Sequence, residues 1–88
     1  MEFSLFGERL EACYRAKGYD AASFAEALGI SEKRLIAYLK DPSEMKLSYL
    51  REIRELLDVS IDYLAGRKDN PPDYLKESEF SESSQRGI

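Results

Sequence analysis

Two short amphipathic segments separated by only three residues, Gly29-Ile30-Ser31, constrain the fold of this chain more than any other feature. Asp20 is a typical N-cap, and the apolar positions that follow it predict a helix over residues 21–28. Gly29 should end that helix, because glycine adopts the left-handed backbone conformation at little cost. Ser31 then caps a second helix, expected over residues 32–40. Helices this short, joined by so tight a turn, can pack only at a steep angle.

This pair forms a helix-turn-helix unit, and the remaining segments up to Gly66 predict three more helices around it. The first should run from about Ser4 to Lys17, with Gly18 ending it. Its apolar face consists of Phe3, Phe6, Leu10, Cys13 and Tyr14. Pro42 interrupts the chain after residue 40. A fourth helix is expected over residues 47–57, and its inward positions are Leu47, Leu50, Ile53, Leu56 and Leu57. Ser60 caps a final turn over residues 61–65. The fold class is therefore all-α, a compact five-helix domain over residues 1–66.

The chain changes character after Gly66. Pro71 and Pro72 cannot continue a helix, and residues 81–87 are polar and rich in serine. Residues 67–88 are therefore expected to form a polar, mobile C-terminal tail. Its large apolar residues, Tyr74, Leu75 and Phe80, are candidates for docking either on the domain or on a second subunit.

Several function classes are disfavoured by composition. The chain has no His, one Cys and no grouping of metal ligands or of nucleophile and base, so we expect no enzyme activity, metal or cofactor. A single Cys fits a reducing compartment, and neither a signal peptide nor an apolar stretch of about 20 residues is present. We therefore expect a cytoplasmic protein that does not enter a membrane.

Charge is distributed unevenly along the 88 residues, whose formal net charge is −4. Residues 31–54 contain six basic and four acidic side chains, a local balance of +2. The middle of the chain is thus the region in which an anion would be most stable.

Four segments at linked spacings resemble the lambda-repressor-like regulators, also known as the Cro-type or xenobiotic-response-element family. They are Phe6-Gly7-Glu8-Arg9-Leu10, residues 24–31, residues 47–57 and residues 59–66, together about three-quarters of the chain with their connections. Some positions depart from the family pattern. Ala21 stands where many members have a Gln that touches the DNA backbone, Leu39 replaces a usual Glu, and Asp41 replaces a usual Gly. Met45 and Lys46 replace a common Pro-Ser.

The resemblance implies that the helix over residues 32–40 enters the major groove of double-stranded DNA. Its outward positions are expected to be Glu32, Lys33, Ile36, Ala37 and Lys40. Lys33 can donate to guanine, Ile36 and Ala37 can contact a thymine methyl group, and Glu32 can accept from cytosine or repel phosphates. The start of this helix at Ser31 offers backbone N–H groups to a phosphate. Further candidates for backbone contacts are Ala21 at the family's Gln position, Ser23, Arg34, Lys40, Ser43 and Lys46.

We expect a sequence-specific transcriptional regulator, a repressor of the type found in phages and mobile elements. One short helix makes few contacts, so a homodimer on a pseudo-palindromic operator is expected. The alternative is a protein-interaction module on the same scaffold, which would bind another regulatory protein instead of DNA. The net charge of −4, Ala21 and Glu32 favour that alternative, and the sign of the surface potential over residues 32–40 discriminates the two.

Overall fold

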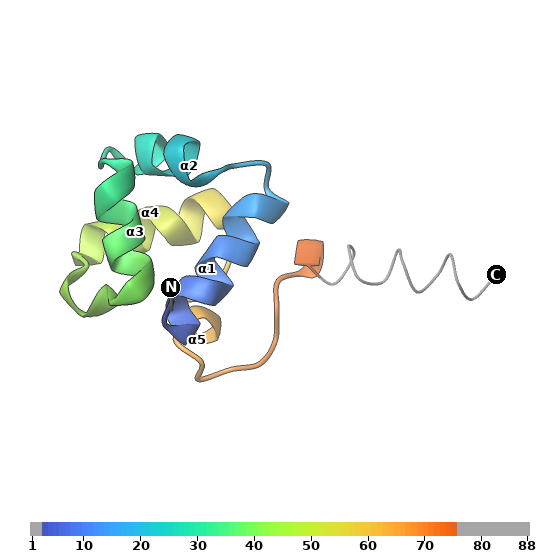
Figure 1. Cartoon of the computed structure of the whole chain (residues 1–88). Coiled ribbons are helices and arrows are strands. Elements are labelled where there is room, and N and C mark those ends of the chain that lie inside the picture. Colours follow the sequence, from blue (N-terminus) through green and yellow to red (C-terminus); the bar gives the residue numbers. More distant parts are fainter. Residues whose placement is uncertain (1–2, 76–88) are drawn as a thin grey trace.

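The computed structural model describes residues 3–75, and within this range it contains helices and no strand (Figure 1). The elements are α1 (Leu5–Ala16), α2 (Ala21–Leu28), α3 (Glu32–Lys40), the 3-10 turn η1 (Pro42–Glu44), α4 (Leu47–Leu57) and α5 (Ile61–Leu64). The all-α, five-helix prediction is confirmed, and α2, α3 and α4 begin and end at the predicted residues. The short turn η1 was expected only as a break after α3.

Side-chain caps explain why the helices begin where they do. Ser4, Ser31 and Ser60 each accept a hydrogen bond from a backbone N–H in the first turn of the helix that follows. Asp20 and Ser23 form a reciprocal capping box at the start of α2. Gly29 ends α2 with a φ of 80°, which is the left-handed conformation expected for it.

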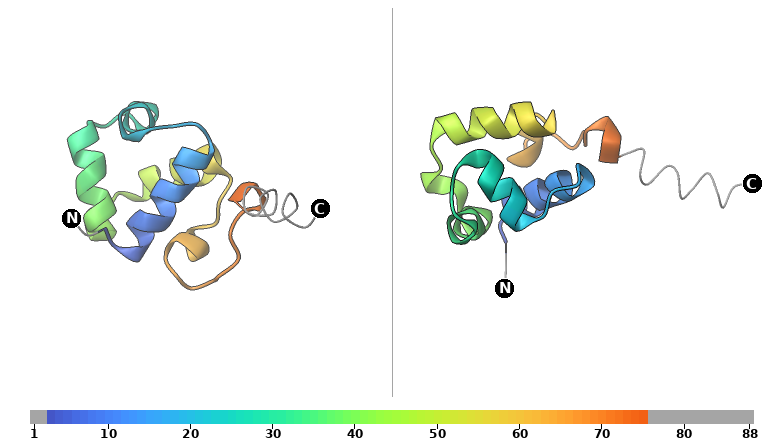
Figure 2. Two further views of the ribbon diagram at one scale, coloured as in Figure 1. Left: turned by 45° about the vertical axis from the view of Figure 1, so that its right-hand side comes forward. Right: turned by 90° about the horizontal axis from the view of Figure 1, so that it is seen from above.

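The core lies where α1, α2, α3 and α4 meet, and α5 closes it at one end. In the right-hand view of Figure 2, α4 runs along one side of the group formed by α1, α2 and α3. The fully buried side chains are Leu10, Cys13, Tyr14, Phe24, Leu35, Leu39, Ile53, Leu57 and Leu64. The steep crossing of α2 and α3 leaves the outer face of α3 uncovered (Figure 1).

The inward face of α4 differs from the prediction at its first position. Leu47 is 66% exposed, whereas Ile53 and Leu57 are fully buried and Leu50 and Leu56 are half-buried. Met45, which precedes α4, is buried and fills the end of the core in place of Leu47. The helical spacing was correct, but the stripe of apolar residues extends one position beyond the edge of the core.

Helices α1 and α3 lie so close together that their backbones are in contact at Gly7 and Leu39. A Cβ atom placed on Gly7 would lie 1.9 Å from the carbonyl oxygen of Leu39. That same oxygen accepts hydrogen bonds from the backbone N–H and the hydroxyl of Ser4, each at 3.0 Å. Only glycine at residue 7 leaves room for this close approach of α3 to α1, and the two hydrogen bonds from Ser4 hold it.

Residues 67–75, which we call the arm, pass around α5 and lie on the side of α1 away from α3 (Figures 1 and 2). The guanidinium of Arg9 donates to the carbonyl oxygens of Tyr63 and Lys68, at 2.6 and 2.9 Å, and pairs with Asp69 at 3.2 Å. The Tyr74 hydroxyl donates to the carbonyl oxygen of Leu57.

The docking alternatives for the tail residues can now be compared with these contacts. Tyr74 and Leu75 are half-buried and pack against the core, so for them docking on the domain is observed. Phe80 lies outside the described residues. The mobility expected for the tail stays a prediction.

None of the helices in residues 3–75 is both long and apolar enough to cross a membrane.

Candidate nucleic-acid interface

The outer face of α3 carries a shallow depression with a volume of about 620 Å³. It is lined by Glu32, Lys33, Ile36, Ala37 and Lys40. These are the five residues that the sequence placed on the outward face. Four of them are exposed, but Ile36 is half-buried and packs against the core. Ile36 follows the fully buried Leu35 directly, so at about 100° per residue it lies at the border of the buried stripe. The expectation that Ile36 faces away from the core was therefore only half right.

A second groove, of about 490 Å³, separates α3 from η1 and the start of α4. It is lined by Ser31, Lys33, Arg34, Ala37, Tyr38, Glu44 and Lys46. Tyr38 is half-buried and packs against the core, and the centroid of its ring lies 6.2 Å from that of Tyr49. We call this groove the basic groove, because three of its side chains are cationic and one is anionic. Tyr38 and Glu44 were not among the predicted site residues, since helical spacing does not show which residue flanks a groove between two elements.

The cations around α3 are free to bind an anion. Lys33, Arg34, Lys40 and Lys46 are all exposed, and none forms an ion pair with another residue in the range 3–75. The Ser31 hydroxyl accepts from the backbone N–H of Arg34 at 3.1 Å, which leaves its own proton available for donation. This arrangement can hold phosphate groups on one border of α3 while Lys33 and Ala37 face outward.

The remaining predicted contacts lie at the edges of this surface. Ala21 is the first residue of α2 and is half-buried against the core. The Ser23 hydroxyl is occupied by the capping box, where it accepts from the backbone N–H of Asp20 at 3.0 Å. Ser43 is exposed in η1, and its backbone N–H donates to the Asp41 carboxylate at 3.1 Å. Of these three, only Ser43 has an exposed, unoccupied side-chain donor.

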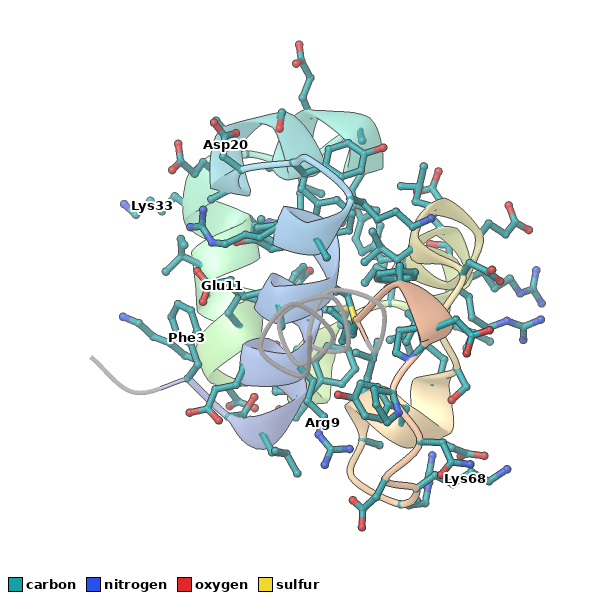
Figure 3. All side chains as sticks on the ribbon, turned by 90° about the vertical axis from the view of Figure 1, so that its right-hand side faces the viewer. Phe3, Arg9, Glu11, Asp20, Lys33 and Lys68 are labelled. Atoms are coloured by element: carbon teal, nitrogen blue, oxygen red, sulfur yellow. The ribbon has the colours of Figure 1, made fainter. Side chains whose placement is uncertain are left out.

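Charged side chains from α1, the N-cap of α2 and the start of α3 act on the buried hydroxyl of Tyr14, a grouping that the sequence did not reveal because these residues are far apart in the chain. Burial is the largest cause of the raised pKa of this hydroxyl; the carboxylates of Glu11, Asp20 and Glu32 raise it further, and the guanidinium of Arg15 lowers it. Figure 3 shows Glu11 and Asp20 on the same side of the molecule as Lys33, away from Lys68. Hydrogen bonds from the backbone and hydroxyl of Ser23 hold the pKa of Asp20 below its usual value, so this carboxylate stays ionised.

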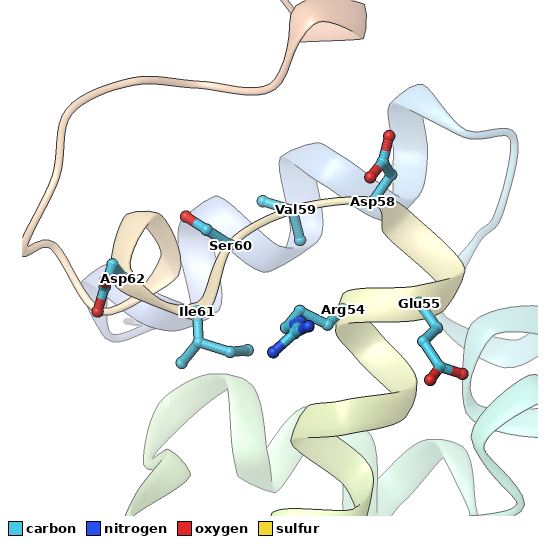
Figure 4. Close-up of a pocket in the computed structure, with 7 residues that line it drawn as sticks. All are labelled: Arg54, Glu55, Asp58, Val59, Ser60, Ile61 and Asp62. Atoms are coloured by element: carbon cyan, nitrogen blue, oxygen red, sulfur yellow. The ribbon is translucent and has the colours of Figure 1, made fainter.

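A larger groove, of about 760 Å³, lies at the corner between α4 and α5 (Figure 4). It is lined by Arg54, Glu55, Asp58, Val59, Ser60, Ile61 and Asp62. Three acidic side chains against one arginine make this groove unfavourable for a phosphate, in spite of its size. In the range 3–75, Arg54 forms an ion pair with neither Glu55 nor Asp58.

Comparison with known proteins gives two relatives, both from Bacillus subtilis (strain 168). The SPbeta prophage-derived uncharacterized HTH-type transcriptional regulator YonR is 37% identical over 60 residues, which cover 68% of this chain and 56% of that protein. The uncharacterized HTH-type transcriptional regulator YqaE is 33% identical over 66 residues, covering 75% of this chain and 57% of that protein. The chain thus spans little more than half the length of these relatives.

No solved structure shows a significant match to the chain. The family model described as "Helix-turn-helix" matches residues 10–64, a segment that runs from the middle of α1 to the last residue of α5. It includes the turn between α2 and α3 and every cation of the basic groove. Together with the two relatives, this match confirms the family expected from the sequence motifs: the chain belongs to the helix-turn-helix family.

Proposed function

We propose that this protein is a sequence-specific DNA-binding transcriptional regulator that inserts α3 into the major groove. The observation that carries the proposal is the set of unpaired cations, Lys33, Arg34, Lys40 and Lys46, around the uncovered face of α3. Both relatives are named as transcriptional regulators of the helix-turn-helix type, and one is prophage-derived, which supports a repressor of phage or mobile-element origin. The locally positive border argues against the alternative of a protein-binding scaffold.

The contacts divide into two kinds. Lys33 and Ala37, with the exposed edge of Ile36, face outward on α3 and read base edges. Lys40, Ser43 and Lys46, with Arg34 in the basic groove, hold the phosphate backbone and fix the register without reading sequence.

Tight binding requires two copies. A homodimer would place two α3 helices about 34–36 Å apart, one helical turn of DNA, on a pseudo-palindromic operator. Leu64 would take no part in the dimer interface, because it is fully buried within the domain.

Selection of enriched sites from random-sequence duplex DNA tests the function. We expect enrichment of a pseudo-palindrome and an affinity that falls steeply as salt rises. Lys33→Ala should weaken binding to the selected site by about 1–3 kcal/mol and relax the preference at one base pair. Lys68→Ala is the matched control, because it removes the same charge from the arm, on the far side of α1.

The regulator function would be refuted by a wild-type chain that enriches no site and shows no salt-dependent binding. Equal losses in the two Lys variants would mean that α3 is not the reading helix. In the first case, the same face would be tested against protein partners.

A further inference from the structure

Tyr38 belongs to both the packed side of α3 and the basic groove, and its hydroxyl is not used within the domain. The residue is half-buried and packs against the core, and it lines the groove together with Arg34 and Lys46. No residue in the range 3–75 forms a hydrogen bond with its hydroxyl. The one buried side-chain polar atom without a partner in this range belongs to Tyr14, so the Tyr38 hydroxyl is open to solvent. The groove therefore contains a free neutral donor beside its cations.

The ring that carries this hydroxyl is held in place by packing. It lies against the core, and the ring of Tyr49 from α4 is tilted against it at 47°, with 6.2 Å between the centroids. A packed tyrosine loses its rotational freedom when the chain folds, not when a ligand binds. Arg34 and Lys46 are exposed, so their long side chains would be ordered only on binding. The Tyr38 hydroxyl is therefore the preorganised donor of the basic groove.

The groove combines two properties that a phosphate site needs. Its cations attract an anion over several ångströms, and its one anion, Glu44, is exposed at the η1 edge. A hydroxyl adds direction, because a hydrogen bond is strong only when donor and acceptor are aligned. Tyrosine hydroxyls are among the groups that bind DNA phosphates in this way.

We propose that the Tyr38 hydroxyl donates a hydrogen bond to a DNA backbone phosphate, which Arg34 and Lys46 attract into the basic groove. This inference rests on the proposed function and deepens it by adding a contact residue for the backbone. Because Tyr38 is part of α3 itself, such a bond fixes how α3 lies in the major groove. It carries no sequence information directly.

Two variants isolate the hydroxyl. Tyr38→Phe removes it and keeps the ring. Tyr49→Phe is the matched control, since it removes the same atom from the neighbouring ring, which does not line the groove. Neither hydroxyl has a hydrogen-bond partner in the range 3–75, so both variants should unfold at the same urea concentration as wild type.

The first measurement is the affinity for the selected site, and for single-base variants of that site, at several salt concentrations. Tyr38→Phe should bind all of these duplexes about three- to tenfold more weakly for each subunit, because one hydrogen bond is lost. The slope of log affinity against log salt should not change, since a neutral hydroxyl displaces no counterion. Lys46→Ala should instead reduce that slope by about one for each subunit, and Tyr49→Phe should bind within twofold of wild type.

The second measurement identifies the phosphate. Operator duplexes that carry a neutral methylphosphonate at one backbone position form a double-mutant cycle with Tyr38→Phe. At one position in each half-site, the methylphosphonate should weaken binding by wild type more than binding by Tyr38→Phe. At the other positions the two proteins should lose affinity equally.

Four outcomes would overturn the inference and leave the proposed function intact. The loss in Tyr38→Phe is no larger than that in Tyr49→Phe, or it is confined to one base pair, which would indicate a base contact. Alternatively, no phosphate couples to Tyr38, or Tyr38→Phe unfolds at a lower urea concentration than wild type, which would show that the hydroxyl is used inside the domain. A wild-type chain that binds no DNA would instead refute the proposed function itself.

Discussion

The hydroxyl of Tyr14 is buried and makes no hydrogen bond with any residue in the range 3–75, whereas that of Tyr74 donates to Leu57. A buried polar group without a partner costs free energy, and a satisfied one contributes modestly. Tyr14→Phe should therefore leave the free energy of unfolding unchanged or raise it by about 1 kcal/mol. Tyr74→Phe should lower it by about 1 kcal/mol. Urea unfolding of both variants measures the difference.

The pair serves as its own control, because each variant deletes one phenolic oxygen and nothing else. A loss in Tyr14→Phe as large as that in Tyr74→Phe would contradict the assignment. It would show that a buried water molecule satisfies the Tyr14 hydroxyl.

At single residues, periodicity predicted which face a side chain occupies but not what it touches. Lys33, Ala37 and Lys40 lie on the outer face of α3 as expected, because a helix of known start has a determined face. The occupied hydroxyl of Ser23 and the exposure of Leu47 depend instead on hydrogen bonds and on where the core ends. Neither the hydrogen bonds of a side chain nor the edge of the core can be predicted from the spacing of apolar residues along one helix.

Among the elements, the contact between α1 and α3 is the most sensitive to substitution. Gly7→Ala would bring a methyl group against the Leu39 carbonyl, and backbone cannot move aside as a flexible side chain can. We expect a loss of about 1–3 kcal/mol in the free energy of unfolding, or more if α3 shifts. Thermal or denaturant unfolding measures this loss.

Glu8→Ala is the control for that variant, since Glu8 is the exposed next residue of α1 and should change stability by less than about 0.5 kcal/mol. Equal stabilities of the two variants would mean that α1 and α3 can separate at no cost.

The helix boundaries could be predicted because capping residues act locally. Asp20, Gly29 and Ser31 set the ends of α2 and α3 through contacts within a few residues. The docked arm could not be predicted, because the bonds of Arg9 to Lys68 and Asp69 join residues 59 and 60 positions apart.

For the whole molecule, stability should be flat near neutral pH and fall in alkali. Burial raises the pKa of Cys13, Tyr14 and Tyr74 above their ordinary values of 9.0, 10.0 and 10.0. Each of these groups loses its proton at a lower pH in the unfolded chain than in the folded one. Its contribution to stability is therefore complete below the pKa of the unfolded state and is lost as the pH rises through the pKa of the folded state. The free energy of unfolding should therefore decline from about pH 9 upward, by at most about 1.4 kcal/mol per pH unit for each group.

Unfolding by urea between pH 6 and 11 checks this profile. The chain has no His, so no change is expected between pH 6 and 8. Tyr14→Phe should make the alkaline decline in the free energy of unfolding less steep. A decline as steep as that of wild type would contradict the role of that hydroxyl.

On the acid side, hydrogen bonds hold the pKa of Asp20 and Asp41 below the ordinary 3.8, so the contribution of these carboxylates to stability is lost as the pH falls below about 4.

The arm extends the packed unit beyond the segment that the family model matches, which ends at residue 64. A chain shortened to residues 1–66 loses the half-buried Tyr74 and Leu75 and two of the bonds of Arg9. We expect it to be less stable than a chain of residues 1–75 by about 2–4 kcal/mol. Its Cys13, which lies near Tyr74, should also react faster with a thiol reagent. Equal stability and reactivity of the two chains would mean that the arm contributes nothing to the core.

The bonds of Arg9 also bear on the order in which the molecule opens. They join α1 to the end of α5 and the start of the arm through a few partly exposed groups, whereas α1 to α4 share a continuous buried core. Segments held by few buried contacts open locally before the rest. The amides of residues 67–75 should then exchange with solvent through brief detachment of the arm, while those of Phe24, Leu35 and Ile53 exchange only through global unfolding. The packed core of α1 to α4, which positions α3, would therefore stay folded while the arm is detached.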